Sequence, residues 1–200
     1  MKGTIYIVDD DDAVRDSLCF LLKTVNLDPT TFTSGDEFLE KYDEEMTGCV
    51  LLDIRMPGTS GIEVQKKLQQ LNCKLPIIFI TGHGDVPMAV EAMQSGAFDF
   101  IQKPFRDQEL LDRIFQALEA HEADEEEANH QRDIQHRYVS LTPREKEVME
   151  FVVKGAANKV IAIDLGVSQR TVEIHRARVM EKMEARSLAE LVRMSMLLEQ

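Results

Sequence analysis

Cysteine is scarce in this sequence: only three are present, and no two of them form a Cys-x-x-Cys pair. An odd number of cysteines without metal-ligand spacing argues against a structural zinc site and fits free thiols in a reducing compartment. The sequence also has no apolar run of about 18 residues, and it opens on a short strand-like segment instead of a signal-peptide pattern. We therefore expect a soluble, cytoplasmic protein without a membrane partner.

Positive charge is scarce as well, because the chain carries a net charge of −13. Such an excess argues against nucleic-acid binding by the molecule as a whole. The charge is unevenly spread: residues 1–117 carry 11 Lys and Arg against 20 Asp and Glu, residues 118–137 carry 2 against 7, and residues 138–200 carry 10 against 9. Only the last segment can approach a phosphate backbone without strong repulsion, so a DNA-binding element is expected there.

The length of 200 residues suits two domains, because domains usually contain roughly 100–150 residues. The first half alternates short β-rich apolar runs with amphipathic helical stretches, which predicts a parallel α/β sheet with crossover helices. The first, third and fourth runs are apolar almost throughout and should form the buried centre of the sheet. The expected strands cover residues 4–8, 29–32, 49–52, 77–80 and 98–101.

The domain boundary is indicated by residues 119–137, which contain neither glycine nor proline and almost no apolar stripe. Their richness in helix formers predicts an exposed helical linker, with disorder as the alternative. Four helical patterns follow this segment. The sequence thus predicts a first domain at 1–118, the linker at 119–137 and a second domain at 138–200.

Polar side chains stand at the ends of the expected strands. Asp9 and Asp10 follow the first strand, Asp53 the third, Thr81 the fourth and Lys103 the fifth. The carboxyl ends of parallel strands form one edge of the sheet, where such folds bind ligands. We therefore expect these five side chains to converge.

Three carboxylates brought together repel one another, so the cluster predicts a bound divalent cation. Hard oxygen ligands favour Mg²⁺, held by Asp10 and Asp53 with Asp9 acting largely through water. Asp53 is then the expected nucleophile toward a phosphoryl group, and the Lys103 ammonium would neutralise charge on the phosphoryl oxygens. Thr81 is placed to hydrogen-bond one of those oxygens.

With these residues in place, the first 117 residues resemble a receiver domain of bacterial response regulators, within the FixJ branch. The resemblance implies a flavodoxin-like fold, a doubly wound five-stranded parallel sheet in the order 2-1-3-4-5. The matching stretches are residues 7–11, 52–58, 79–88 and 103–105.

The resemblance also implies a role for single residues. The aromatic switch position falls on Phe100, which lacks a hydroxyl and can act by packing alone. A cis peptide bond is implied before Pro104. His83 is a candidate phosphohistidine or base, but in this loop we favour a structural or partner-contact role. The remaining assignments are Asp53 as the phosphoacceptor, Asp9 and Asp10 as the acidic metal pair, Arg55 as donor of a main-chain carbonyl to the metal, Thr81 as the switch hydroxyl and Lys103 as the phosphate-contacting lysine.

Residues 141–200 read as a small all-α domain of four helices. Thr142, Pro143 and Glu145 predict a capping box with proline at the first helical position. Further on, a short turn at Gly166 joins two helical patterns, and Ser168 is placed to cap the second of them. Two helices joined in this way predict a helix-turn-helix, the second helix of which enters a DNA groove.

The second helix of this motif is expected to turn Val172, Val179 and Met183 inward. The segment resembles a LuxR-type output domain, the NarL/FixJ module, through residues 141–145, 158–162 and 170–176. That resemblance implies DNA contacts by Lys159, Thr171, Val172, His175 and Arg176, and dimerisation through the fourth helix. The side chains expected to face outward, where they can reach phosphates and base edges, are Arg170, Thr171, His175, Arg176, Arg178 and Lys182.

Together the two resemblances imply a two-component response regulator. A sensor histidine kinase would phosphorylate Asp53, and a homodimer would then bind promoter DNA and act on RNA polymerase. One alternative is an enzyme, a phosphohydrolase that uses an aspartyl phosphate, although no substrate pocket or cap insertion is evident. Another is a flavin-binding protein, which the acidic loop after the first strand disfavours because it would repel a phosphate.

Overall fold

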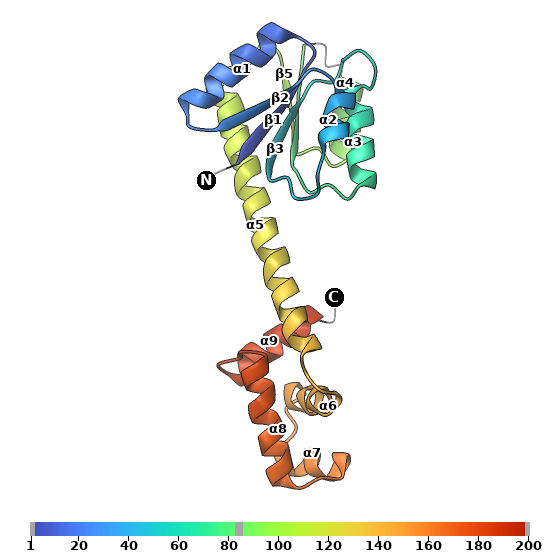
Figure 1. Cartoon of the computed structure of the whole chain (residues 1–200), viewed down its shortest axis with the longest axis vertical. Coiled ribbons are helices and arrows are strands. Elements are labelled where there is room, and N and C mark those ends of the chain that lie inside the picture. Colours follow the sequence, from blue (N-terminus) through green and yellow to red (C-terminus); the bar gives the residue numbers. More distant parts are fainter. Residues whose placement is uncertain (1–2, 83–85, 199–200) are drawn as a thin grey trace. The chain divides into compact units, whose positions relative to one another are not determined.

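The computed structural model describes residues 3–82 and 86–198, which form two compact units, Met1–Asp124 and Glu125–Gln200. Strands and helices alternate along the first unit (Figure 1). Its elements are β1 (Thr4–Val8), α1 (Asp12–Thr24), β2 (Asp28–Phe32), α2 (Gly35–Lys41), β3 (Gly48–Leu52), α3 (Gly61–Gln70), β4 (Ile77–Thr81), α4 (Val86–Gln94), β5 (Asp99–Gln102) and the beginning of α5 (Asp107–Val139).

The five strands form one parallel sheet in the order β2-β1-β3-β4-β5, which confirms the predicted fold. β1 lies between β2 and β3, so Val8 pairs with Phe32 on one side and with Leu52 on the other. The residues that directly follow β1 and β3 therefore leave the same edge of the sheet from neighbouring strands.

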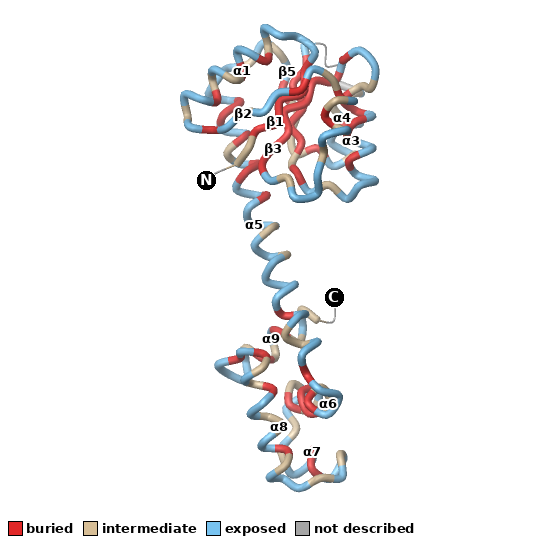
Figure 2. Tube along the Cα trace, in the orientation of Figure 1, coloured by how far each residue is buried: buried red, intermediate tan, exposed pale blue. Residues whose placement is uncertain are grey.

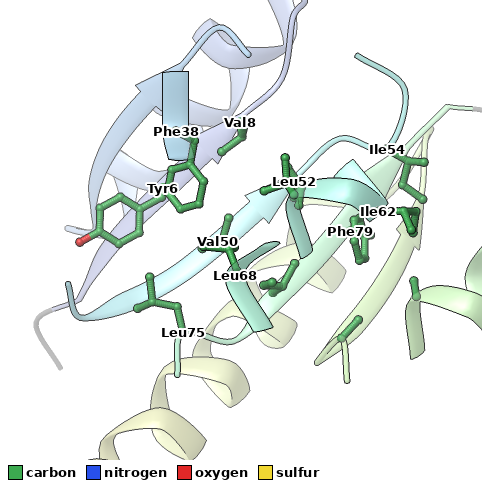
Figure 3. Packing of buried hydrophobic residues seen from close by; sticks show 14 of the residues in the cluster. Tyr6, Val8, Phe38, Val50, Leu52, Ile54, Ile62, Leu68, Leu75 and Phe79 are labelled. Carbon is green, nitrogen blue, oxygen red and sulfur yellow. The ribbon is translucent and has the colours of Figure 1, made fainter. Parts of the chain in front are cut away.

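Both faces of the sheet are buried under helices, as Figure 2 shows for its central strands. Val50 and Leu52 pack on the face covered by α2, α3 and α4, where Phe38 and Leu68 surround them (Figure 3). Cys49 and Leu51, which alternate with them along β3, pack on the face covered by α1 and α5. Because full burial of one such aliphatic side chain contributes about 1.5–3 kcal/mol, the strand interiors favour apolar residues and polar groups collect at the strand ends.

Helix α5 extends from Asp107 to Val139, so the segment 119–137 is helical throughout. Within residues 119–137, two side chains are buried, His121 in the first unit and Ile134 in the core of the second. The division between the units falls within this segment, after Asp124. In the described part of the chain, no helix is both long enough and apolar enough to cross a membrane.

The second unit consists of the end of α5 and four further helices. Gly166 ends α7 in the left-handed conformation, with φ 65°, and Ser168 caps α8 by accepting a hydrogen bond from the N–H of Thr171. The predicted inward side chains of α8, Val172, Val179 and Met183, are all buried. The four helices are α6 (Pro143–Val153), α7 (Asn158–Leu165), α8 (Gln169–Lys182) and α9 (Leu188–Leu198).

The predicted capping box at the start of α6 is present and includes an ion pair. Thr142 accepts a hydrogen bond from the N–H of Glu145, whose carboxylate accepts one from the N–H of Thr142. The same carboxylate, 2% exposed, lies 2.7 Å from Nζ of Lys182 at the end of α8. Burial alone would raise the pKa of Glu145, but the ammonium and the Thr142 hydrogen bonds outweigh it and lower the pKa to about 2.

Replacing Glu145 should therefore destabilise the second unit in a pH-dependent way. A carboxylate with a lowered pKa stabilises the folded state fully above its unfolded pKa, and this contribution is lost as the pH falls from about 4.5 toward 2. We expect Glu145→Gln to lower the free energy of unfolding by about 1–2 kcal/mol at pH 7 and by clearly less at pH 3, in denaturant titrations followed by NMR signals of α6–α9.

Glu147→Gln is the matched control, because Glu147 forms an exposed ion pair with Arg144 and such pairs contribute about 0–1 kcal/mol. A loss of stability in Glu145→Gln that is equal at pH 7 and pH 3 would contradict the role of the ion pair.

Candidate phosphorylation site and nucleic-acid interface

The structure brings three of the predicted side chains together at the carboxyl edge of the sheet. Nζ of Lys103 lies 2.7 Å from Oδ2 of Asp9 and 3.1 Å from Oδ1 of Asp53. Each residue directly follows its strand, and the main-chain N–H of Asp53 continues the sheet by donating to the carbonyl oxygen of Val8 at 2.8 Å. The lysine thus bridges the ends of β1 and β3 from the end of β5.

Both carboxylates are removed from water: Asp9 is 3% and Asp53 8% exposed. Burial raises the pKa of Asp53, and the Lys103 ammonium and the Arg55 N–H oppose this rise. Burial would lower the pKa of Lys103, but its hydrogen bond to Asp9 and the charge of Asp53 reverse the effect, so its pKa is raised. The ammonium group is therefore charged at neutral pH and compensates one of the two carboxylates.

The backbone after β3 holds Asp53 in place. Oδ2 of Asp53 accepts a hydrogen bond of 2.7 Å from the main-chain N–H of Arg55. Helix α3 begins against the same segment, because the N–H of Gly61 donates to the carbonyl oxygen of Ile54 at 2.9 Å. A side chain at Gly61 would place its Cβ 2.3 Å from the carbonyl oxygen of Asp53, so this position needs glycine. Nothing in the sequence marks Gly61, since this contact depends on the path of α3.

Two further predicted residues, Thr81 and Phe100, belong to the neighbouring strands β4 and β5. Thr81 ends β4, is 1% exposed, and its carbonyl oxygen accepts a hydrogen bond from the N–H of Lys103. Phe100 is half-buried and packs against the core on the α4 face. The Lys103–Pro104 bond is cis, as the resemblance implied. His83 lies outside the described residues.

The expected cluster of three carboxylates is only partly present. Asp10 is exposed and does not join Asp9 and Asp53, whose repulsion Lys103 already reduces. Within residues 3–82 and 86–198, no three His, Cys, Asp or Glu side chains are grouped as a metal site. The oxygen donors still match Mg²⁺, which takes one or two carboxylates and keeps several waters.

The first turns of helix α1 contain a buried arginine that the sequence pattern does not indicate. Asp11 caps this helix by accepting hydrogen bonds from the N–H groups of Ala13 and Val14. Arg15, 7% exposed, donates to the main-chain carbonyl oxygen of Asp9 at 2.5 Å and pairs with Asp12. An arginine among exposed acidic residues carries no sign of burial in the sequence.

In the second unit, the predicted DNA-contact residues differ in accessibility. Lys159, Arg170 and Arg178 are exposed, with 82% of the Arg170 side chain accessible. Thr171 and His175 are partly buried. The basic side chains of α7 and α8 that are exposed are therefore Lys159, Arg170 and Arg178.

Three of the residues predicted to contact DNA pack or form hydrogen bonds within the second unit. Val172 is fully buried among core residues, so the DNA contact expected for it is corrected to a packing role. Lys182 donates to the carboxylate of Glu145 and to the carbonyl oxygen of Ser140, and these contacts hold the end of α8 against the start of α6. Arg176 is half-buried and donates to Oδ1 of Asn158 at 2.9 Å, which ties α8 to the start of α7.

Each of the two units matches a known protein family. Residues 5–115 match the response regulator receiver domain, and residues 139–195 match the bacterial regulatory proteins of the luxR family. The chain belongs to the response regulators. A receiver domain joined to a luxR-family domain makes this chain a transcriptional response regulator, which combines a phosphorylated receiver with a DNA-binding output domain.

Relatives match this response regulator over nearly its whole length. It is 48% identical over 196 residues to the transcriptional regulatory protein FixJ of Bradyrhizobium diazoefficiens, covering 98% of this chain and 95% of that protein. It is 46% identical over 194 residues to nodulation protein W of the same organism, covering 97% and 86%. A solved structure of the response regulator StyR is 42% identical, covers 98% of both chains and superposes with a TM-score of 0.91.

Proposed function

We propose that Asp53 is the residue of this response regulator that accepts the phosphoryl group. The observation that carries the proposal is the buried Asp53 carboxylate with the Lys103 ammonium 3.1 Å from its Oδ1. A carboxylate oxygen can attack the phosphorus of a phosphohistidine on a sensor histidine kinase. The new O–P bond forms as the N–P bond breaks, and the histidine nitrogen keeps the electron pair. Lys103 then faces the added negative charge.

The proposal includes a bound divalent cation, because the site carries more negative than positive charge. Lys103 balances only one of the two buried carboxylates, and a phosphoryl group adds further negative charge. Asp9, Asp10 and Asp53, with the main-chain carbonyl of Arg55, are the oxygen donors that would hold Mg²⁺. When bound, the cation supplies positive charge to the phosphoryl oxygens and orients them for in-line attack.

The same proposal gives Thr81 and Phe100 the role of a switch. Thr81 is the last residue of β4, the strand next to β5, and its carbonyl oxygen accepts a hydrogen bond from the N–H of Lys103. The hydroxyl group of Thr81 therefore lies at the same edge of the sheet as Lys103. A hydrogen bond from that hydroxyl to a phosphoryl oxygen would move the end of β4. Phe100, half-buried on the α4 face, can respond by repacking, which biases an equilibrium between two existing conformations.

Asp53→Asn should abolish hydroxylamine-labile phosphorylation by acetyl phosphate or by a cognate kinase, because an amide is not a nucleophile toward phosphorus. The fold should persist, since asparagine has the same size and keeps an acceptor for the Arg55 N–H. Labelling with radioactive phosphate, read on denaturing gels, measures the effect, and Asp16→Asn on the exposed face of α1 is the matched control. Full labelling of Asp53→Asn would show that the acceptor lies elsewhere.

Removal of divalent cations should also stop phosphorylation. In excess EDTA we expect the rate with acetyl phosphate to fall to background, and added Mg²⁺ to restore it, because the incoming phosphoryl group otherwise meets uncompensated negative charge. Undiminished labelling in EDTA would rule out the cation while leaving the assignment of Asp53 intact.

We further propose that α8 is the element that enters the DNA groove, with contacts by Lys159, Arg170 and Arg178. The capped N-terminus of α8 adds backbone N–H donors near Thr171 that suit a phosphate. The net charge of residues 138–200 is close to neutral, so attraction must come from this local basic face. His175 and Arg176, partly buried, remain candidates for closer contacts.

Dimerisation through α9 completes the proposed activation. Leu188 and Met196 of α9 are 42% and 62% exposed, and pairing of two copies could bury such apolar side chains. A dimer places two output domains on two half-sites, so binding of the second becomes effectively intramolecular. Contact with RNA polymerase at a promoter, and a cytoplasmic location where DNA and the kinase are both accessible, belong to the same proposal.

Lys159→Ala and Arg178→Ala should weaken DNA binding by the phosphorylated protein, because each removes an exposed positive charge from the proposed interface. If the lost contact is to a phosphate, the slope of log affinity against log salt should fall by about one unit. Fluorescence anisotropy at several salt concentrations, on specific and scrambled duplexes, measures both quantities. Lys154→Ala, equally exposed but outside α7 and α8, should bind as the parent does. Parental affinity in both interface variants would mean that the DNA face lies elsewhere.

A further inference from the structure

Arg15 is a buried charge to which the proposed function gives no role. It lies in the first turns of α1 and is only 7% exposed, whereas Asp12 and Asp16 of the same helix are exposed. Burial of a guanidinium group is unfavourable unless its N–H groups are hydrogen-bonded. The groups that accept hydrogen bonds from Arg15 therefore indicate the structural role of this residue.

The guanidinium group acts on the backbone between the two acidic residues that follow β1. It donates to the main-chain carbonyl oxygen of Asp9 at 2.5 Å and pairs with the carboxylate of Asp12. The Asp12 side chain is 89% exposed, so water screens that pair, and the buried bond to Asp9 is the protected one. Because a peptide group is planar, the carbonyl of Asp9 and the N–H of Asp10 turn together. Arg15 thus sets the plane of the Asp9–Asp10 peptide.

Asp9 is held from several directions at once. Its N–H donates to the carbonyl oxygen of Phe32, Oδ1 accepts from the N–H of Asp11 at 2.9 Å, and Oδ2 accepts from Lys103. Asp10, by contrast, is exposed, so the direction of its carboxylate depends on the backbone of this loop. The bond from Arg15 fixes that backbone immediately before Asp10.

We propose that Arg15 is a positioning residue of the phosphorylation site, orienting the Asp9–Asp10 peptide so that Asp10 presents its carboxylate to a divalent cation. This inference rests on the proposed function, because it requires cation binding at Asp9, Asp10 and Asp53. Removing a residue that orients metal-binding groups typically weakens metal affinity by about 10–100-fold. An arginine that only filled space would leave the cation affinity of the folded protein unchanged.

The test measures binding of Mn²⁺ to the unphosphorylated full chain by water-proton relaxation. Arg15→Met keeps much of the apolar volume and removes the donors, and we expect it to weaken Mn²⁺ binding roughly tenfold or more. Arg15→Lys, which keeps one donor, should recover part of the affinity. With acetyl phosphate, Arg15→Met should need correspondingly more Mg²⁺ for half-maximal phosphorylation, while the rate at saturating Mg²⁺ stays within about twofold of the parent.

Lys23→Met is the matched control, because it removes a positive charge from the exposed end of α1 and should bind Mn²⁺ as the parent does. If Arg15→Met does not fold, Arg15→Leu carries the same measurement, since it also removes every donor and an apolar side chain is easier to bury. Mn²⁺ affinity within about twofold of the parent in a folded Met or Leu variant would overturn the inference. If instead the parent binds no Mn²⁺ and is phosphorylated in EDTA, the proposed cation site itself is wrong and the inference falls with it.

Discussion

The receiver depends on the interaction of one ammonium group, that of Lys103, with two buried carboxylates, Asp9 and Asp53. Two negative charges with so little access to water would be strongly unfavourable without it. The interaction requires that the ends of β1, β3 and β5 meet at one edge, which the strand order and the apolar central strands provide. The main-chain N–H of Arg55 then holds the Asp53 carboxylate, and that of Gly61 holds the segment after it. The guanidinium group of Arg15 holds the backbone of Asp9.

Much of this arrangement could be predicted from the sequence, because it follows from short-range rules. Apolar runs of four or five residues separated by amphipathic stretches specify a parallel sheet, and polar residues just after those runs must lie at its carboxyl edge. Asp9, Asp53 and Lys103 each directly follow such a run, so the pattern alone places them at this edge. Thr142, Gly166 and Ser168 were equally predictable, since caps and turns are set by a few neighbouring residues.

What could not be predicted depends on partners far apart along the chain or on burial. Lys182 is a basic residue on the second helix of the helix-turn-helix, which is where a DNA contact is expected. Its ammonium group nevertheless binds Glu145, 37 residues earlier. Val172 matched a family contact position although it lies in the core. Asp10 follows Asp9 directly, but only the folded loop shows that one is buried and the other exposed. A pattern of residue types does not distinguish these cases.

The bond between Lys182 and Glu145 has a consequence for how the output domain is mapped experimentally. Truncation of Lys182 leaves a carboxylate in the interior with its ammonium partner gone, so a smaller share of the molecules is folded. An alanine scan scored by promoter occupancy would then report Lys182 as essential even where the loss of occupancy came only from the loss of folded protein. Normalising each variant to its folded fraction separates a lost DNA contact from a lost fold.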